Sequence, residues 1–262
     1  MNAIADFARA RQELRPIVMV TAYDALIARI VAASEADAIL VGDSVAMVVH
    51  GHPSTVHATL EMMALHTAAV RRGAPAAVVI ADLPFGTFRR GRHAAFDAAG
   101  HLLQAGANAV KLEGVRGHEE AIAHLVDGGI PVMGHLGLTP QSVQQLGYRV
   151  QARTPEEAGR LRGDARRLQE LGAFAVVLEC IPSALAAELT HELAIPTIGI
   201  GAGRETGGQV LVMTDVLGLD ASFRPRFARR YADGHAVVLD AVNAYARDVR
   251  NARFPAGTEV PA

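Results

Sequence analysis

The chain has 262 residues, half of them hydrophobic, and its formal net charge at pH 7 is −2. This balance gives no indication of nucleic-acid binding, and no apolar run approaches the roughly 18 residues of a membrane span. The single cysteine, Cys180, excludes an internal disulfide framework, and the mixed-charge segment 1–16 lacks the apolar core of a signal peptide, so we expect a cytoplasmic protein.

Apolar runs of strand length alternate with helix-like stretches along the chain. Asp24 and Thr59 stand where two of the helical stretches begin and are predicted to cap them. The predicted strands cover residues 16–23, 37–43, 76–85, 107–114, 130–137, 173–180, 195–203 and 209–215, the last with the weakest pattern.

Strands that alternate with helices predict a parallel sheet, because parallel neighbours need a crossover connection. The strands are almost continuously apolar, which indicates burial on both faces. A closed (βα)8 barrel, the TIM barrel, fits eight strands better than the alternative, an open doubly wound sheet. We expect a single domain over residues 1–262, with a short N-terminal helix before the barrel and a loose C-terminal tail after a helical pattern around 235–249.

Ionisable side chains stand where several predicted strands end. In chain order they are Asp43 followed by Ser44, Asp82, the pair Lys111 and Glu113, His135, and Glu179. Lys111 and Glu113 are two residues apart and therefore share one face of their strand. In a barrel the carboxyl ends of all strands meet at one mouth, where barrel enzymes build their active sites.

Four carboxylates that share this mouth need counter-charges. Lys111 supplies one, and a divalent cation would supply the rest; an all-oxygen ligand set favours Mg²⁺ over zinc. Taken singly, an aspartate after a strand is most often a helix N-cap, and Lys111 could simply neutralise Glu113. Several consecutive strands that end in this way favour a functional site, because capping does not call for lysine or histidine.

Three other features have weaker functional interpretations. HGHPSTVH (50–57) suggests zinc but lacks a second spaced ligand pair, which favours a loop over the mouth. GIGAGRETGG (199–208) could cradle a phosphate at a helix N-terminus, although glycine-rich turns are common. Cys180 follows Glu179, so alternation turns it away from the interior, and we interpret it as a packing residue rather than a nucleophile.

A series of motifs in this order resembles the ketopantoate hydroxymethyltransferase family. They are TAYD, LVGDS, HTAAVRRGAP, ADLPF, AGANAVKLEG, PVMGHLGLTPQSV, LEC and IPTIGIGAG followed by GQVLVMTD, and they extend over roughly residues 16–247. The chain departs from the family pattern at Pro53, at Phe88 and in a shortened QLGYRVQAR stretch, all of them in predicted loops.

The resemblance implies a barrel of the phosphoenolpyruvate mutase and isocitrate lyase type that binds Mg²⁺ and forms a homo-oligomer, commonly a decamer. It implies metal ligation by Asp43 and Asp82, with Glu113 completing the metal surroundings, and a proton acceptor at Glu179. The implied substrate contacts are Asp43, Ser44, Asp82 and Lys111. The implied reaction transfers a hydroxymethyl group from 5,10-methylenetetrahydrofolate to 3-methyl-2-oxobutanoate, giving ketopantoate for pantothenate and coenzyme A biosynthesis.

Two alternatives remain at this point. One is a related barrel reaction that cleaves or rearranges a C–C or C–P bond of a 2-oxo acid; such relatives carry a catalytic cysteine in a mobile loop, whereas Cys180 is predicted at a strand end. The other is a catalytically silent barrel, which predicts metal binding without folate-dependent turnover.

Overall fold

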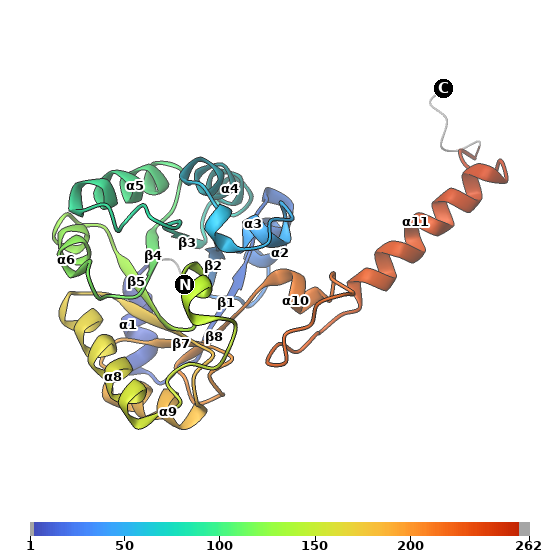
Figure 1. The fold of residues 1–262 in the computed structure, drawn as a ribbon. Coiled ribbons are helices and arrows are strands. Elements are labelled where there is room, and N and C mark those ends of the chain that lie inside the picture. The colour runs from blue at the N-terminus through green and yellow to red at the C-terminus, as the bar shows by residue number, and fades with distance from the viewer. Residues whose placement is uncertain (1–2, 257–262) are drawn as a thin grey trace. The chain divides into compact units, whose positions relative to one another are not determined.

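Parallel strands close into a barrel in the computed structural model, which describes residues 3–256 (Figure 1). Each strand pairs with the next in sequence, and β8 pairs with β1. The strands are β1 (Ile17–Thr21), β2 (Ala38–Val41), β3 (Val78–Asp82), β4 (Ala109–Glu113), β5 (Val132–Gly137), β6 (Ala175–Glu179), β7 (Thr197–Ile200) and β8 (Gly208–Leu211). The predicted closed barrel is confirmed, and the open sheet is excluded.

Helices surround the barrel (Figure 1). Between residues 3 and 211 the helices are α1 (Ala5–Gln12), α2 (Ala25–Ala32), α3 (Val45–Val48), α4 (Leu60–Gly73), α5 (Arg92–Gln104), α6 (Glu119–Asp127), α7 (Val143–Leu146), α8 (Pro155–Glu170) and α9 (Ser183–Glu192), with 3-10 turns η1 (Thr55–His57) and η2 (Pro140–Ser142). Asp24 and Thr59 cap α2 and α4 through side-chain hydrogen bonds, as predicted. No helix in residues 3–256 has both the length and the hydropathy to cross a bilayer.

The chain divides into two compact units, Met1–Leu211 and Val212–Ala262. The first contains the barrel, preceded by the expected N-terminal helix, α1. The second contains α10 (Met213–Leu217) and α11 (Gly234–Arg250), the latter where the helical pattern at 235–249 predicted it. That the whole chain forms one domain stays a prediction, and residues 257–262 of the expected loose tail lie outside the described residues.

The last two strands depart from the predicted pattern. β8 ends at Leu211, and the residues after it form α10, so the strand predicted at 209–215 is wrong in its second half. A short apolar run fits a strand and a buried helix equally well. Residues 201–207 join β7 to β8 without a helix. The phosphate cradle predicted for 199–208 therefore lacks the helix N-terminus that it requires.

Alternate residues of the strands fill the barrel interior. Ile80, Ala109, Met133 and Val177 belong to the central buried cluster, one each from β3 to β6. Two residues further along these strands lie Asp82, Lys111, His135 and Glu179. Side chains alternate between the faces of a strand, so these four point to the same side as the core residues below them. The ionisable groups therefore form the uppermost layer of a packed interior.

Helix α1 packs against the opposite, amino-terminal end of the barrel interior. Its Phe7 and Ala10 belong to the same buried cluster as Ile17, at the start of β1. The rings of Phe7 and Phe174 meet edge to face, with centroids 5.2 Å apart. Arg11 adds hydrogen bonds to two carbonyl oxygens at the end of α9. The N-terminal helix is thus part of the core.

Phe7→Ala should lower the free energy of unfolding by about 3 kcal/mol or more, because a fully buried ring leaves a cavity. Urea denaturation followed by circular dichroism measures this loss. Leu14→Ala, at an exposed position just after α1, is the control and should change stability by less than about 0.5 kcal/mol. Equal losses in the two variants would show that α1 does not belong to the core.

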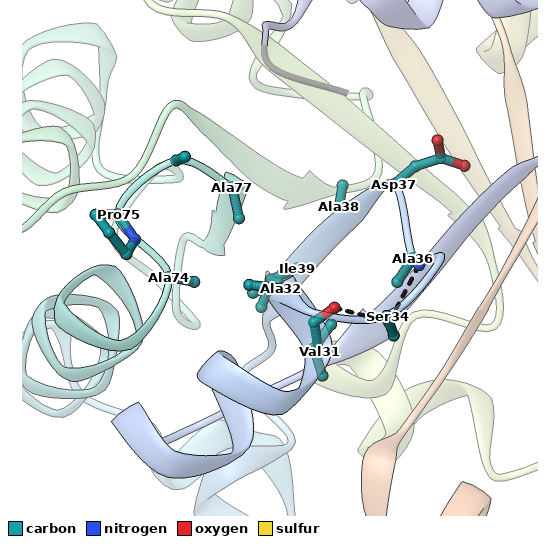
Figure 2. Close-up of a pocket in the computed structure, with 11 residues that line it drawn as sticks. Val31, Ala32, Ser34, Ala36, Asp37, Ala38, Ile39, Ala74, Pro75 and Ala77 are labelled. Carbon is teal, nitrogen blue, oxygen red and sulfur yellow. Dashed lines mark hydrogen bonds between the residues drawn. The ribbon is translucent and has the colours of Figure 1, made fainter.

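A cavity of about 310 Å³ lies at the amino ends of β2 and β3, beside the ends of α2 and α4 (Figure 2). Small apolar residues such as Ala36 and Pro75 form most of its lining. The carboxylate of Asp37 is already bound, since it accepts a hydrogen bond from Val18 and pairs with Arg15. The strand-end ionisable groups stand at the other end of the barrel, so we assign this cavity no chemistry.

Candidate active site

The strand-end residues predicted from the sequence lie together at the carboxyl end of the barrel. The register sets Asp82 of β3 beside Lys111 of β4, and Glu113 of β4 beside His135 of β5. These four side chains are almost completely buried, whereas Glu179 at the end of β6 keeps 15% of its side chain exposed. Glu179 is therefore the carboxylate of this set most open to an incoming molecule.

Asp43 lies in the turn between β2 and α3 and faces the site. Its backbone N–H donates to Asp82 Oδ2 at 3.0 Å, and its own Oδ2 accepts a hydrogen bond from Gln141 Nε2 at 2.8 Å. Helix α3 has Ser44 as its N-cap and shows no side-chain capping bond. Gly42 leaves room for this turn, because a Cβ there would come within 2.8 Å of Ser44 Oγ. The capping explanation is thus wrong for Asp43.

Lys111 is the cation at the centre of the acidic residues. Its Nζ lies 3.0 Å from Asp82 Oδ1 and 3.2 Å from His135 Nδ1. Burial alone would lower the pKa of Lys111, but the carboxylates, Asp82 foremost, outweigh it and raise that pKa above its usual value. Lys111 therefore stays charged, and its ion pair is with Asp82 rather than with Glu113.

The buried carboxylates lack sufficient positive charge. The pKa of Asp43 is raised well above its usual value, first by burial and then by repulsion from Asp82 and Glu113. Burial also raises the pKa of Asp82, although Lys111 opposes this. Within residues 3–256, Asp82 Oδ1 is contacted by Lys111 alone, and the contact of Glu113 Oε1 with His135 is a long one of 3.4 Å. A further cation would relieve all three groups.

His135 connects two carboxylates. Its Nδ1 lies 3.4 Å from Glu113 Oε1, and its Nε2 lies 3.1 Å from Glu179 Oε2. Burial and the charge of Lys111 both disfavour a protonated imidazole, but the bonds to Glu113 and Glu179 outweigh them and raise the pKa of His135 to about 9. The ring therefore fixes the position of Glu179. His135 was predicted at a strand end, but this role was not predicted.

Gln141 is a site residue that was not predicted from the sequence. It lies in η2, and its backbone N–H donates to Glu113 Oε2 at 2.9 Å. Its side-chain amide bonds both Asp43 and the carbonyl oxygen of Leu83, at 2.8 and 3.0 Å. A single loop residue thus joins two acids from different strands. The only signal was its place just after the fifth strand, at the same end of the barrel.

Tyr23 orients Ser44, since the two hydroxyl oxygens lie 2.8 Å apart. Burial raises the pKa of Tyr23, so the phenol stays protonated and can donate to or accept from Ser44. A substrate contact by Ser44 stays a prediction.

The segment 50–57 lies beside the mouth, as its interpretation as a loop predicted. Its turn η1 contacts η2, the turn that carries Gln141, and Ser54 and Thr55 are buried.

Cys180 follows β6 in a left-handed backbone conformation with φ 47°, and burial, together with the charge of Glu179, raises its pKa to about 11. A thiol protonated at neutral pH supports a packing role.

Among the described residues, no group of three or more His, Cys, Asp or Glu side chains is arranged so that it could hold a metal ion by itself.

Solved structures with this architecture match nearly the whole chain. Phosphonopyruvate hydrolase in complex with oxalate and Mg²⁺ has a TM-score of 0.65 at 13% identity, over 99% of this chain and 93% of that one. A 2,3-dimethylmalate lyase, described as a PEP mutase/isocitrate lyase superfamily member, has a TM-score of 0.60 at 18% identity, over 100% and 92%. At these identities the likeness shows the fold alone, and it confirms the predicted type of barrel.

The sequence is much closer to a set of named enzymes. It is 50% identical over 260 residues, 99% of both chains, to the 3-methyl-2-oxobutanoate hydroxymethyltransferase of Bdellovibrio bacteriovorus. The enzyme of that name from Salinibacter ruber is 52% identical over 247 residues, 94% of this chain and 93% of the relative. Residues 2–257 also match the model described as ketopantoate hydroxymethyltransferase. With this match over almost its full length and with the acidic mouth of the barrel in place, the chain belongs to the ketopantoate hydroxymethyltransferase family.

Proposed function

We propose that this protein transfers the one-carbon unit of 5,10-methylenetetrahydrofolate to C3 of 3-methyl-2-oxobutanoate and forms ketopantoate. One observation carries the proposal: a buried layer of carboxylates around Lys111, in a chain 50% identical over its length to an enzyme named for this reaction. For the assembly and its location we propose a cytoplasmic homo-oligomer, commonly a decamer in the family; the free thiol of Cys180 is compatible with a reducing compartment.

The residues at the mouth fit a Mg²⁺ ion. The raised pKa values of Asp43 and Asp82, and the crowding of these carboxylates with Glu113 around Lys111, are features that a hard dication would relieve. Mg²⁺ needs only one or two protein carboxylates, because it keeps several waters and accepts substrate oxygens. We assign Asp43 and Asp82 as ligands, with Glu113 completing the surroundings. When bound, the ion supplies Lewis-acid stabilisation of the substrate enolate.

The protein's own groups account for the proton transfer. In this proposal Lys111 balances the carboxylate of the 2-oxo acid, and Asp43, Ser44 and Asp82 complete the substrate contacts. Glu179 takes the C3 proton, and the electron pair of that C–H bond forms the enolate. C3 then bonds to the one-carbon unit, water supplies the hydroxyl oxygen, and tetrahydrofolate leaves. His135, bonded to Glu179 and Glu113, positions the base.

Incubation with 3-methyl-2-oxobutanoate, 5,10-methylenetetrahydrofolate and Mg²⁺ should yield ketopantoate, detected by mass spectrometry. EDTA should stop the reaction, and excess Mg²⁺ should restore it. Cleavage of the 2-oxo acid without folate would instead indicate the lyase alternative. Metal binding without any turnover would indicate a silent barrel.

A further inference from the structure

The loop after β3 forms a structured rim beside the acidic mouth. Thr87 closes a tight turn by donating both its N–H and its hydroxyl to the carbonyl oxygen of Pro84, at 3.1 and 2.7 Å. Phe88 anchors the turn: it is fully buried, and its ring lies 5.0 Å from that of His118. Phe85, at the apex, keeps 49% of its surface exposed. The turn thus holds one aromatic ring inward and presents another to solvent.

Two exposed arginines follow on the same loop. Arg89 donates from Nη2 to the carbonyl oxygen of Glu113 at 3.3 Å, which fixes its guanidinium at the edge of the acidic layer. Arg90 is the next residue and is also exposed. Neither arginine pairs with a carboxylate among the described residues. By contrast, Arg116 on the neighbouring β4–α6 loop pairs with Asp164 at 2.7 Å.

We propose that this folate rim, defined as Phe85, Arg89 and Arg90, binds the p-aminobenzoyl-glutamate end of the folate co-substrate. Phe85 contacts the aryl ring, and the two arginines bind the glutamate carboxylates. The inference rests on the proposed function, because that function makes a folate the co-substrate.

The chemistry of folates places their aryl ring close to the reacting carbon, since the ring is bonded to N10, a nitrogen that carries the one-carbon unit. Phe85 lies three residues after Asp82, so their Cα atoms are at most about 11 Å apart. An exposed aromatic residue at this distance can contact a ring whose neighbouring nitrogen faces the mouth.

The charge of the rim suits the folate tail. Each glutamate in the tail adds a carboxylate, which the acidic residues of the mouth would repel. The guanidinium groups of Arg89 and Arg90, which pair with no carboxylate of the described residues, offset that repulsion and can bind carboxylates through hydrogen bonds. A tail with more glutamates gives these arginines more carboxylates to bind, so the rim should favour polyglutamylated folate.

The test compares KM for monoglutamyl and pentaglutamyl 5,10-methylenetetrahydrofolate at low ionic strength. The unmodified protein should have the lower KM for the pentaglutamyl form. In the double variant Arg89→Gln/Arg90→Gln, that KM should rise about tenfold and approach the monoglutamyl value, while kcat changes little. Arg89→Lys/Arg90→Lys should keep most of the preference, because it keeps both charges. Phe85→Ala should raise KM for both donors alike, and Phe85→Tyr should not.

Arg116→Gln is the matched control, because it removes one positive charge at the same end of the barrel from a guanidinium already paired with Asp164. It should leave the ratio of the two KM values unchanged. Equal KM values in the unmodified protein would overturn the proposal, as would an equal loss of preference in the Arg116→Gln control. No ketopantoate from either donor would instead refute the proposed function, so the two failures are distinguishable.

Discussion

Glu179→Gln is expected to abolish exchange of the C3 proton of 3-methyl-2-oxobutanoate with deuterium from D₂O, while the variant still binds the 2-oxo acid. Glutamine has nearly the shape of glutamate and can still bond His135, but its neutral amide does not accept a proton near pH 7. Loss of a positioned general base slows proton transfer by about 10²- to 10⁴-fold. Loss of the C3 proton signal in NMR spectra measures the exchange, and it needs no folate.

Two further glutamates make this experiment specific. Glu188→Gln removes an exposed carboxylate of α9 that pairs with Arg162, and it should leave exchange at the unmodified rate. Glu113→Gln changes the other carboxylate that contacts His135. Normal exchange in Glu179→Gln would remove Glu179 from the role of base. If exchange is instead lost only in Glu113→Gln, the role passes to Glu113.

Two features explain why much of the site could be predicted from the sequence: side chains alternate between the two faces of a strand, and the strands close into a barrel. Asp82 and Glu179 continue the inward-facing series that includes Ile80 and Val177. Since parallel strands all end at the same mouth, residues almost a hundred positions apart in sequence can be placed at one end of the barrel without any knowledge of the loops. Site residues can therefore be predicted from the positions where strands end, as long as the backbone is regular.

The parts that could not be predicted depend on tertiary contacts. Gln141 reaches Asp43 across 98 residues, through a turn that no periodic pattern specifies. The bonds of His135 to both Glu113 and Glu179 depend on barrel register and tilt rather than on its own strand. The end of β8 was wrong for a local reason, because an apolar run that includes Val212 and Met213 fits either a strand or the start of α10.

Asp43→Asn is expected to stabilise the metal-free protein while it removes Mg²⁺-dependent turnover. The pKa of Asp43 is raised by burial and by Asp82 and Glu113, so the folded protein holds a proton that the unfolded chain has released. Above the unfolded-state pKa of about 3.9, the unfolded state therefore binds fewer protons, and the stability of the unmodified protein falls as pH rises. Asparagine carries no charge to desolvate, and its carbonyl oxygen can still accept a hydrogen bond from Gln141.

The expected gain at pH 8 in EDTA is on the order of 1 kcal/mol, or about 3 °C in Tm, and it should shrink as the pH approaches 4. Mg²⁺ should reverse the order of stability, because an ion that binds only the folded state stabilises the unmodified protein and not the variant. Asp97→Asn, which removes an exposed carboxylate on α5, should match the unmodified protein under both conditions. A metal-free Asp43→Asn protein that is less stable than the unmodified one, or one that Mg²⁺ stabilises equally, would contradict a ligand role for Asp43. The opposite signs of the two effects matter here, because a residue that only supports the fold would lower stability and activity together.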